Sequence, residues 1–279
     1  MKWETAKNSI IIFLIIVNVT LFTLGRYNDN KYSLTIQQEK NVMNMLGSNK
    51  VSMYIDFPKE SMPMATLTME PNEYDYNKEK IAENFLGEDY YISSDEEDKQ
   101  VYSNGENTIT FENGFFYIAL NTPIPFKDNT DDVLKYFGKP ISSFTLDRIT
   151  TDEHHLYYEY REKYKKNIIY TNRLEFCIEG NNIISIEGYY ARNIGYGDNQ
   201  KEIISVDMAL FTFVKVAKEI YGDVEIFIEG IDVVYYQEEY FSYSENNNIT
   251  NAMPCYRIYV RDQNVPFIIN AYTNKVINY

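Results

Sequence analysis

The sequence of 279 residues is poor in basic residues, in cysteine and in histidine. Its 26 Lys and Arg stand against 41 Asp and Glu, which gives a formal net charge of −15. Nucleic-acid binding depends largely on phosphate neutralisation, so this balance argues against DNA or RNA as a ligand, and it disfavours anionic lipid headgroups too. Two cysteines exclude a disulfide-rich scaffold and a four-thiolate zinc site, and two histidines restrict histidine chemistry to one place.

Signature motifs of the common hydrolases and nucleotide-binding enzymes are missing as well. There is no Gly-x-Ser-x-Gly, no glycine-rich phosphate loop and no His-Glu-x-x-His. His154 and His155 are adjacent, and neighbouring strand residues point to opposite faces, so a solvated turn explains the pair better than a metal site. The acidic runs at 88–89 and 95–98 lack the ligand spacing of a calcium loop. We therefore predict no catalytic residue, no cofactor and no metal.

Only one long apolar run is present, the 15 residues of Ile10–Leu24. A helix needs about 20 residues to cross a bilayer, and the flanks supply the remainder, with Trp3 and Tyr27 as interfacial rings. No convincing small-x-small cleavage site follows, so we predict an uncleaved signal anchor over residues 1–30. Because a short N-terminal tail usually stays inside, we expect a single-pass protein of the cell membrane with a cytoplasmic N-terminus and extracytoplasmic residues 31–279.

Two polar residues, Asn18 and Thr20, interrupt the apolar run. Polar groups at membrane depth seek partners, at roughly 0.6–2 kcal/mol per interhelical hydrogen bond. One hypothesis is that they mark the face that contacts a partner helix, together with Ile11, Ile15 and Phe22. The alternative is that Thr20 bonds its own backbone and Asn18 lies near the outer interface.

Beyond the anchor, the sequence repeats one plan four times: a short amphipathic helix that ends in a large apolar residue and glycine, then an extended stretch. The four glycines are Gly47, Gly87, Gly138 and Gly222, and glycine is favoured just past a helix end. Ser205 is the predicted N-cap of the last helix, whose apolar residues recur at helical spacing. The plan predicts further helices that end at Leu46 and lie over 81–86 and 133–137.

Alternating apolar residues around turn residues predict three hairpins, over 108–120, 173–189 and 255–272. Further strands are expected over 51–57, 66–69, 155–160 and 224–228, and the tyrosine-rich stretch from Tyr235 is better explained as a half-buried strand than as a glycan-stacking surface. Together these segments predict an α+β fold, in which helices pack on one face of antiparallel sheets after an N-terminal transmembrane helix.

The pair of prolines in Thr122–Phe126 predicts a linker, because proline continues neither a helix nor a central strand. It would divide the exterior into two sheet-rich domains, 31–122 and 123–279, with a polar loop over 193–200. Cys177 and Cys255 could form a bridge between two hairpins, or each could be a small buried apolar residue.

The layout resembles the YycI and YycH accessory proteins of the YycFG (WalKR) two-component system, and the YycI type is the closer in size. The resemblance is carried by the Met-Lys-Trp start, the single anchor, Met53–Pro58, the kinked Ser61–Met64 stretch and the repeated helix–hairpin units. It implies no catalysis, a role in the control of cell-wall metabolism, and two partners: the sensor histidine kinase and a YycH-like protein. The C-terminal residues 256–278 also resemble the hairpin ending of PepSY-type domains, except that Asn270 and Asn274 replace the usual Asp and Gly.

The sequence leaves three functions open. The first is an externally facing regulator of a sensor histidine kinase that acts by protein–protein contacts. The second is a wall-facing glycan-binding module or hydrolase, and the third is a PepSY-like inhibitor of an external protease. A cleft with two inward carboxylates would favour the hydrolase, whereas a continuous sheet surface would favour the partner role.

Overall fold

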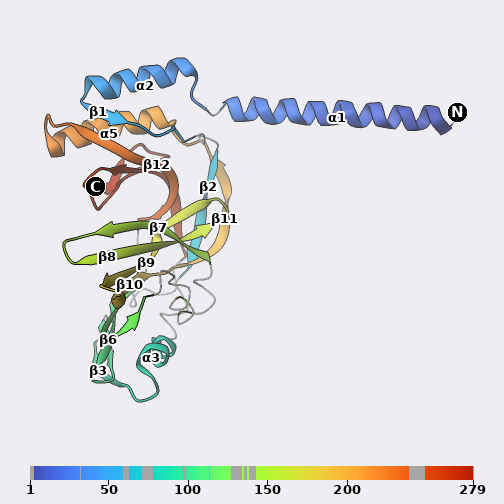
Figure 1. Cartoon of the computed structure of the whole chain (residues 1–279). Coiled ribbons are helices and arrows are strands. Elements are labelled where there is room, and N and C mark those ends of the chain that lie inside the picture. Colours follow the sequence, from blue (N-terminus) through green and yellow to red (C-terminus); the bar gives the residue numbers. More distant parts are fainter. Residues whose placement is uncertain are drawn as a thin grey trace.

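The computed structural model describes residues 3–31, 33–58, 63–70, 78–96, 99–112, 114–126, 134, 137, 143–238 and 249–278. Figure 1 shows a body of curved sheet from which α1 (Trp3–Lys31) projects, with α2 (Ile36–Ser48) and α5 (Val206–Tyr221) at one end of the body and α3 (Lys78–Leu86) at the other. The sheet-rich α+β class is therefore confirmed. Within the described residues, none of the helices combines the length and the apolar character that a membrane crossing needs.

The elements lie as follows along the chain. The described helices are α1 (Trp3–Lys31), α2 (Ile36–Ser48), α3 (Lys78–Leu86) and α5 (Val206–Tyr221). The strands are β1 (Val51–Met53), β2 (Met64–Glu70), β3 (Tyr91–Asp95), β4 (Lys99–Ser103), β5 (Asn107–Glu112), β6 (Phe115–Pro125), β7 (Phe144–Thr151), β8 (His155–Tyr164), β9 (Asn167–Glu179), β10 (Asn182–Tyr189), β11 (Arg192–Lys201), β12 (Ile226–Gln237), β13 (Thr250–Val260), β14 (Phe267–Asn270) and β15 (Val276–Asn278).

The described strands join into one 15-stranded sheet in the order β11-β2-β13-β12-β9-β10-β6-β5-β4-β3, with β1, β7, β8, β14 and β15 attached beside this path. β9 is the connecting strand. Its C-terminal part pairs with β10, whereas near its start it pairs with β12 through the single parallel register Tyr235↔Ile169. Between these two parts the register against β8 shifts at Arg161/Glu162. At this irregularity β9 therefore changes its pairing partner from β12 to β10. It joins a C-terminal half-sheet (β1, β2, β11–β15) to a central half-sheet (β3–β10).

All three predicted hairpins are confirmed, as β5–β6, β9–β10 and β13–β14. Their turns contain Gly114, Gly180 and Asp262, each with φ between 61° and 78°. A backbone of this hand matches the right-handed twist of the flanking strands, so the turn residues set the register.

The predicted helix ends are confirmed at two of the four glycines. Gly87 and Gly222 follow α3 and α5 with φ of 83° and 75°. Gly47 instead lies inside the last turn of α2, which is closed by Asn49, whose N–H donates to the carbonyls of Gly47 and Leu46. Gly138 lies outside the described residues, as does most of the helix predicted over 133–137. Ser205 is the N-cap of α5 as predicted, although its hydroxyl bonds the Asp207 carboxylate rather than a backbone N–H.

Two segments predicted as irregular are strands. Residues Thr122–Pro125 are the last part of β6. They extend past the end of β5, whose pairing with β6 stops at Leu120↔Asn107. Only β10 still pairs with this part of β6, so no second ladder requires the N–H groups that proline lacks. Residues 193–200 belong to β11, which forms against the distant β2. The division into domains 31–122 and 123–279 stays a prediction.

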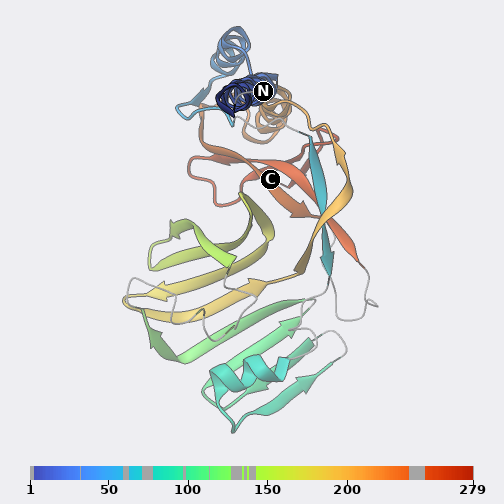
Figure 2. The same cartoon turned by 90° about the vertical axis from the view of Figure 1, so that its right-hand side faces the viewer.

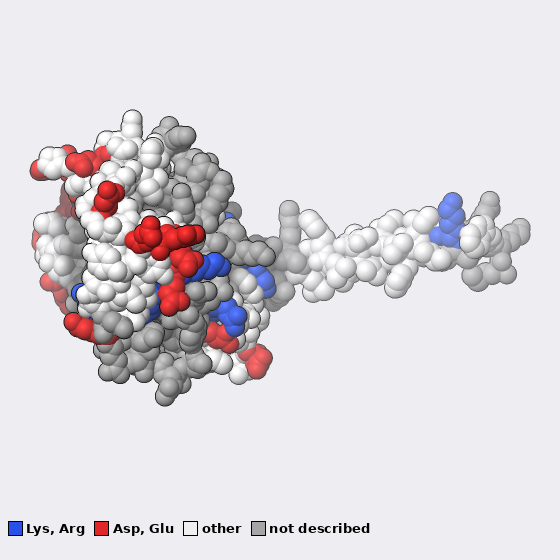
Figure 3. Space-filling view, turned by 90° about the horizontal axis from the view of Figure 1, so that it is seen from below, with Lys and Arg blue, Asp and Glu red and all other residues white. Residues whose placement is uncertain are grey.

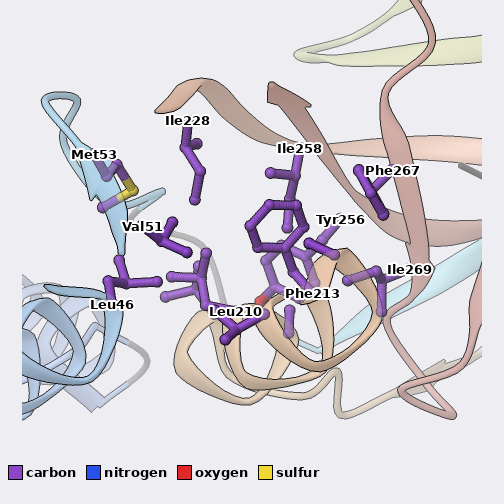
Figure 4. Close-up of a cluster of buried hydrophobic side chains, with 14 of the residues drawn as sticks. Leu46, Val51, Met53, Leu210, Phe213, Ile228, Tyr256, Ile258, Phe267 and Ile269 are labelled. Atoms are coloured by element: carbon purple, nitrogen blue, oxygen red, sulfur yellow. The ribbon is translucent and has the colours of Figure 1, made fainter. Parts of the chain in front are cut away.

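Helices α2 and α5 cover the C-terminal half-sheet and bury its main core. Figure 4 shows Leu46 and Val51 facing Leu210 of α5, with Phe213, Tyr256 and Phe267 on the far side of Leu210. Met53 belongs to the same buried cluster. Phe213 is fully buried and meets the Phe267 ring edge-on, with the ring centroids 4.9 Å apart. The period-3.6 apolar face of α5 is what makes this layer, since each of its inward residues reaches the sheet.

The second core lies at the opposite end of the body. There α3 packs on one face of the central half-sheet, as Figure 2 shows, and places Ile81 and Leu86 against aromatic strand residues such as Phe111, Phe116 and Phe176. Both cysteines are free: Cys255 is buried and Cys177 is half-buried. Of the two alternatives that the sequence left open, the structure therefore favours small apolar residues over a bridge.

Candidate functional site

Helix α1 exposes apolar side chains on all sides. Figure 1 shows it projecting away from the sheet body. The large apolar residues of Ile10–Leu24 are 45–64 % exposed, except that Val17 is half-buried. Thr20 donates its hydroxyl to the Ile16 carbonyl at 2.8 Å. This is the local bond that the alternative hypothesis assigned to Thr20, and it satisfies the hydroxyl without a partner helix.

The five residues predicted to contact a partner helix do not share one face. At about 100° per residue, Ile11, Ile15, Asn18 and Phe22 fall within an arc of about 60°, whereas Thr20 lies on the opposite side. Asn18 is exposed on the first face. The helix thus brings four of the five together into one ridge, which we call the Asn18 ridge.

Charge is distributed unevenly between this helix and the body. Figure 3 shows acidic residues gathered over the body, whereas the described part of the projecting helix is mostly uncharged. The formal charge of −15 therefore resides mainly on the folded body.

A buried ionic junction holds the β7–β8 hairpin to the C-terminal half-sheet. Arg257 of β13 donates to both carboxylate oxygens of Asp147 in β7, at 2.5 and 3.0 Å, and to both oxygens of Asp232 in β12, at 2.9 and 2.7 Å. The Arg257 and Asp147 side chains are only 4 % and 5 % exposed. Bidentate Arg–carboxylate pairs combine strength with a defined geometry, so this arginine fixes how the strands meet.

Arg161 of β8 extends the junction. It pairs with Glu159 at 3.0 Å, lies 3.7 Å from Asp147, bonds the Tyr170 carbonyl and stacks over the Tyr170 ring at 3.9 Å. Arg148, which follows Asp147 in β7, donates to two carbonyls in the turn after β13. These contacts join residues far apart in sequence, and the strand pattern gave no sign of them.

A buried carboxylate lies beside the junction, at the irregularity of β8 against β9. Glu162 is 7 % exposed and accepts a hydrogen bond from Asn172 Nδ2 at 2.5 Å. Asn172 also bonds the carbonyl and the N–H of Ala191. Burial raises the pKa of Glu162 from 4.5 to about 7, against the opposing effect of the Asn172 and Ser143 hydrogen bonds.

The residues singled out for metal or nucleophile chemistry are structural. Asp152 accepts from the backbone N–H groups of His154 and His155 at 2.8 Å each and from the Tyr157 hydroxyl at 2.8 Å. These bonds, that of His154 first, hold the pKa of Asp152 well below its usual range. His154 thus belongs to the turn before β8, as predicted, and His155 begins the strand. Within the described ranges, no group of three or more His, Cys, Asp or Glu is arranged to hold a metal ion.

Two pockets open on the described surface. One, of about 330 Å³, is lined by residues of β5, β6 and β10 that include Glu112 and Glu187. Each of these carboxylates is in an ion pair, with Lys99 at 2.8 Å and with Arg173 respectively, so neither has the environment of a poised acid or base. The other pocket, of about 150 Å³, lies between β2, β11, β12 and the β8–β9 turn and is lined by tyrosines and Lys166.

These features define a class: a sheet-rich α+β protein with a charged junction at its centre and an apolar N-terminal helix that projects from the body. The family model described as YycI protein matches residues 30–272, and the chain belongs to the YycI family. Its members are regulatory accessory proteins of the YycFG two-component system, and the family is not one of enzymes.

Solved structures of other proteins share this fold. An uncharacterized protein from Eubacterium rectale ATCC 33656 superposes with a TM-score of 0.54 at 12% identity, over 86% of this chain and 99% of that one. The Bacillus megaterium YpeB C-terminal domain matches with a TM-score of 0.39 at 14% identity, over 75% of this chain and 96% of that one. No curated protein sequence matches the chain.

Proposed function

We propose that this protein is a membrane-anchored, extracytoplasmic regulator of the sensor histidine kinase of the YycFG system, with a YycH-like protein as second partner. Helix α1 is the anchor, the N-terminus is cytoplasmic and the sheet body lies outside the cell membrane. The regulator acts through its transmembrane helix and through the outer body, in a pathway that controls cell-wall metabolism. Family membership supports the choice of system.

The observation that carries the proposal is the exposure of α1 on every side. A helix that is apolar all round requires apolar surroundings, and the sheet body does not supply them. The 29 residues of α1 extend over about 43 Å, against a hydrocarbon thickness of about 30 Å. The apolar run alone is about 22 Å long, so its flanking residues and a locally thinned bilayer make up the difference.

Regulation follows from preference for one state of the kinase. A partner shifts an equilibrium only by the difference between its affinities for the two states. The Asn18 ridge offers one polar group among apolar neighbours, so its amide can bond a kinase helix in one state and lose that bond in the other.

The test compares two polar residues of the same helix in the full-length chain. Asn18→Leu removes the ridge amide, and it should weaken co-purification with the kinase by about 3–30-fold and alter phosphorylation of the response regulator. Thr20→Val is the matched control, because its hydroxyl already bonds Ile16, and it should behave as the wild type. Replacement of Ile10–Leu24 by an unrelated apolar helix should abolish regulation.

Two results would refute the proposal. One is kinase output that stays unchanged when the whole apolar run is replaced. The other is a tagged full-length chain that brings down neither the kinase nor a YycH-like protein from detergent extracts.

A further inference from the structure

The sheet ends at a strand that has one free edge. Among the described strands, β3 pairs only with β4, and it lies at the opposite end of the strand order from β11. A strand at a sheet edge presents unpaired N–H and C=O groups, to which a further strand can bind. Tyr91 and Ile92 of β3 are 56% and 49% exposed. Because neighbouring strand residues point to opposite faces, β3 is accessible to another chain on both faces.

Ile92 lies at the rim of the second core. It is opposite Tyr102 of β4 in the strand register, and Tyr102 is buried in that core, where its ring contacts those of Tyr90 and Phe111. Residues directly opposite each other share one face of a sheet, so Ile92 lies on the face that α3 covers. The apolar layer thus reaches β3 and ends there with an exposed side chain. An apolar residue on an added strand would bury Ile92 and continue the layer.

Negative charge is concentrated around this edge. Residues 78–112 contain three Lys against ten Asp and Glu, a net charge of −7 in a chain whose total is −15. Figure 3 views the body from the end that carries α3 and β3, and acidic side chains gather on it. Two of the three lysines are engaged elsewhere: Lys78 is 9% exposed and lies over the Phe111 ring, and Lys99 pairs with Glu112 at 2.8 Å. The carboxylates near β3 therefore outnumber the cations available to them.

Carboxylates lie at both ends of β3. Glu88 and Asp89 precede the strand and Glu96 follows it; all three are exposed, and no described residue forms an ion pair with them. Two copies of the chain that paired antiparallel through β3 would bring Glu96 of one copy beside Glu88 and Asp89 of the other. Like charges across a strand pair are destabilising. The charge of this edge therefore favours a partner of opposite charge over a second copy.

We propose that the free edge of β3 binds an extended segment of a partner protein as an added strand, with alternating apolar residues and with Lys or Arg at both ends. In this mode of recognition main-chain hydrogen bonds supply affinity, and alternate side chains supply specificity. β3 has five residues and extends over about 17 Å, so a central stretch of that length places the basic ends near Glu88 and Glu96. The interaction involves the sheet body alone, so it holds or fails independently of the proposed contact between α1 and the kinase.

The experiment measures the binding of labelled peptides to the full-length chain in detergent micelles by fluorescence anisotropy. The basic peptide is Lys-Lys-Thr-Val-Thr-Val-Thr-Lys-Lys. An acidic peptide has Glu in place of every Lys, and a proline peptide has Pro in place of every Thr, so it keeps the charge and the valines but lacks N–H groups for strand pairing. We expect the basic peptide to bind at least tenfold more tightly than either of the others, and its affinity to fall as salt is raised.

Matched variants locate the binding site, and circular dichroism establishes that each is folded. Ile92→Thr should weaken binding of the basic peptide about fivefold, because less apolar surface is buried. Its control is Ile194→Thr, which removes an isoleucine that is 48% exposed on β11, the edge strand at the other end of the sheet, and should bind as the wild type does.

A second pair of variants tests the charge. The double variant Glu88→Gln, Asp89→Asn should weaken binding of the basic peptide at low salt, because one of its basic ends loses its carboxylates. The control Asp198→Asn, Glu202→Gln removes the same charge at exposed positions far from β3 in the sheet and should bind as the wild type does.

Four results would overturn the proposal. The basic peptide does not bind; the acidic or the proline peptide binds as tightly as the basic one; or Ile92→Thr and Ile194→Thr bind it equally well. The fourth is a chain that is dimeric in light scattering without peptide and becomes monomeric on Ile92→Thr, because a second copy then occupies the edge.

Discussion

Glu162 offers the sharpest test of the energetics of the sheet junction. Its carboxylate is buried, accepts from Asn172, and forms no ion pair with a cation of the described residues. Burial disfavours the charged form, so the folded state binds a proton more tightly than the unfolded state. In Glu162→Gln the amide oxygen can still accept from Asn172, but the side chain no longer ionises.

The expected magnitude follows from the pKa shift. The folded pKa is raised from 4.5 to about 7, and one pKa unit corresponds to about 1.4 kcal/mol, so ionisation of Glu162 costs the folded state about 3 kcal/mol. Because the folded pKa is the higher one, the stabilising effect of protonated Glu162 is complete below about pH 4.5. It is lost as the pH rises through 7. Glu162→Gln should therefore exceed the unfolding free energy of the wild type by less than about 1 kcal/mol near pH 5 and by about 3 kcal/mol at pH 8.

Urea unfolding followed by circular dichroism at pH 5, 6, 7 and 8 measures this difference, and it avoids reliance on the single tryptophan, Trp3, which lies outside the sheet. Glu219→Gln, at an exposed position of α5, is the control, and its unfolding free energy should stay within about 0.5 kcal/mol of that of the wild type. The reasoning is refuted if wild type and Glu162→Gln change in parallel from pH 5 to pH 8, or if the variant is the less stable of the two at pH 8.

Three further predictions concern the packing of the body. Arg257→Met leaves the buried Asp147 with only Arg161, at 3.7 Å, as a nearby cation, so urea unfolding should show a loss of about 3 kcal/mol, whereas a loss below 1 kcal/mol would contradict the junction. Gly188→Ala places a Cβ 2.3 Å from an aromatic carbon of Phe116 and should lower the unfolding free energy by about 1–3 kcal/mol. The control Gly47→Ala has open space around its Cβ and should be neutral or stabilising. Equal effects of the two substitutions would be evidence against the packing argument. A thiol reagent should label the half-buried Cys177 in the folded protein before the buried Cys255, and it should find two thiols after unfolding. No labelled thiol after unfolding would indicate a bridge.

The sequence by itself determined the elements whose signals are local. The Asn113-Gly114 turn lies between alternating strands, Ser205 precedes a helix of regular apolar period, and Ile10–Leu24 is apolar throughout. Each of these signals depends on residues within one turn or one hairpin, where backbone preference and side-chain period act directly. For the same reason the positions of three hairpins, of α5 and of the projecting helix could be predicted from the chain.

The tertiary structure alone decided how these elements meet. β2 and β11 pair although more than a hundred residues separate them, and this pairing turned an expected loop into a strand and created the tyrosine pocket. Arg257 and Asp147 are 110 residues apart, and neither has a local feature that names the other. A buried charge needs an oppositely charged partner, and the order of the strands in the sheet determines which residue lies close enough to be that partner. The pairing therefore cannot be predicted from the local sequence. The local sequence pattern thus defines the hairpins. The long-range pairing of strands determines where the charged junction and the pocket form.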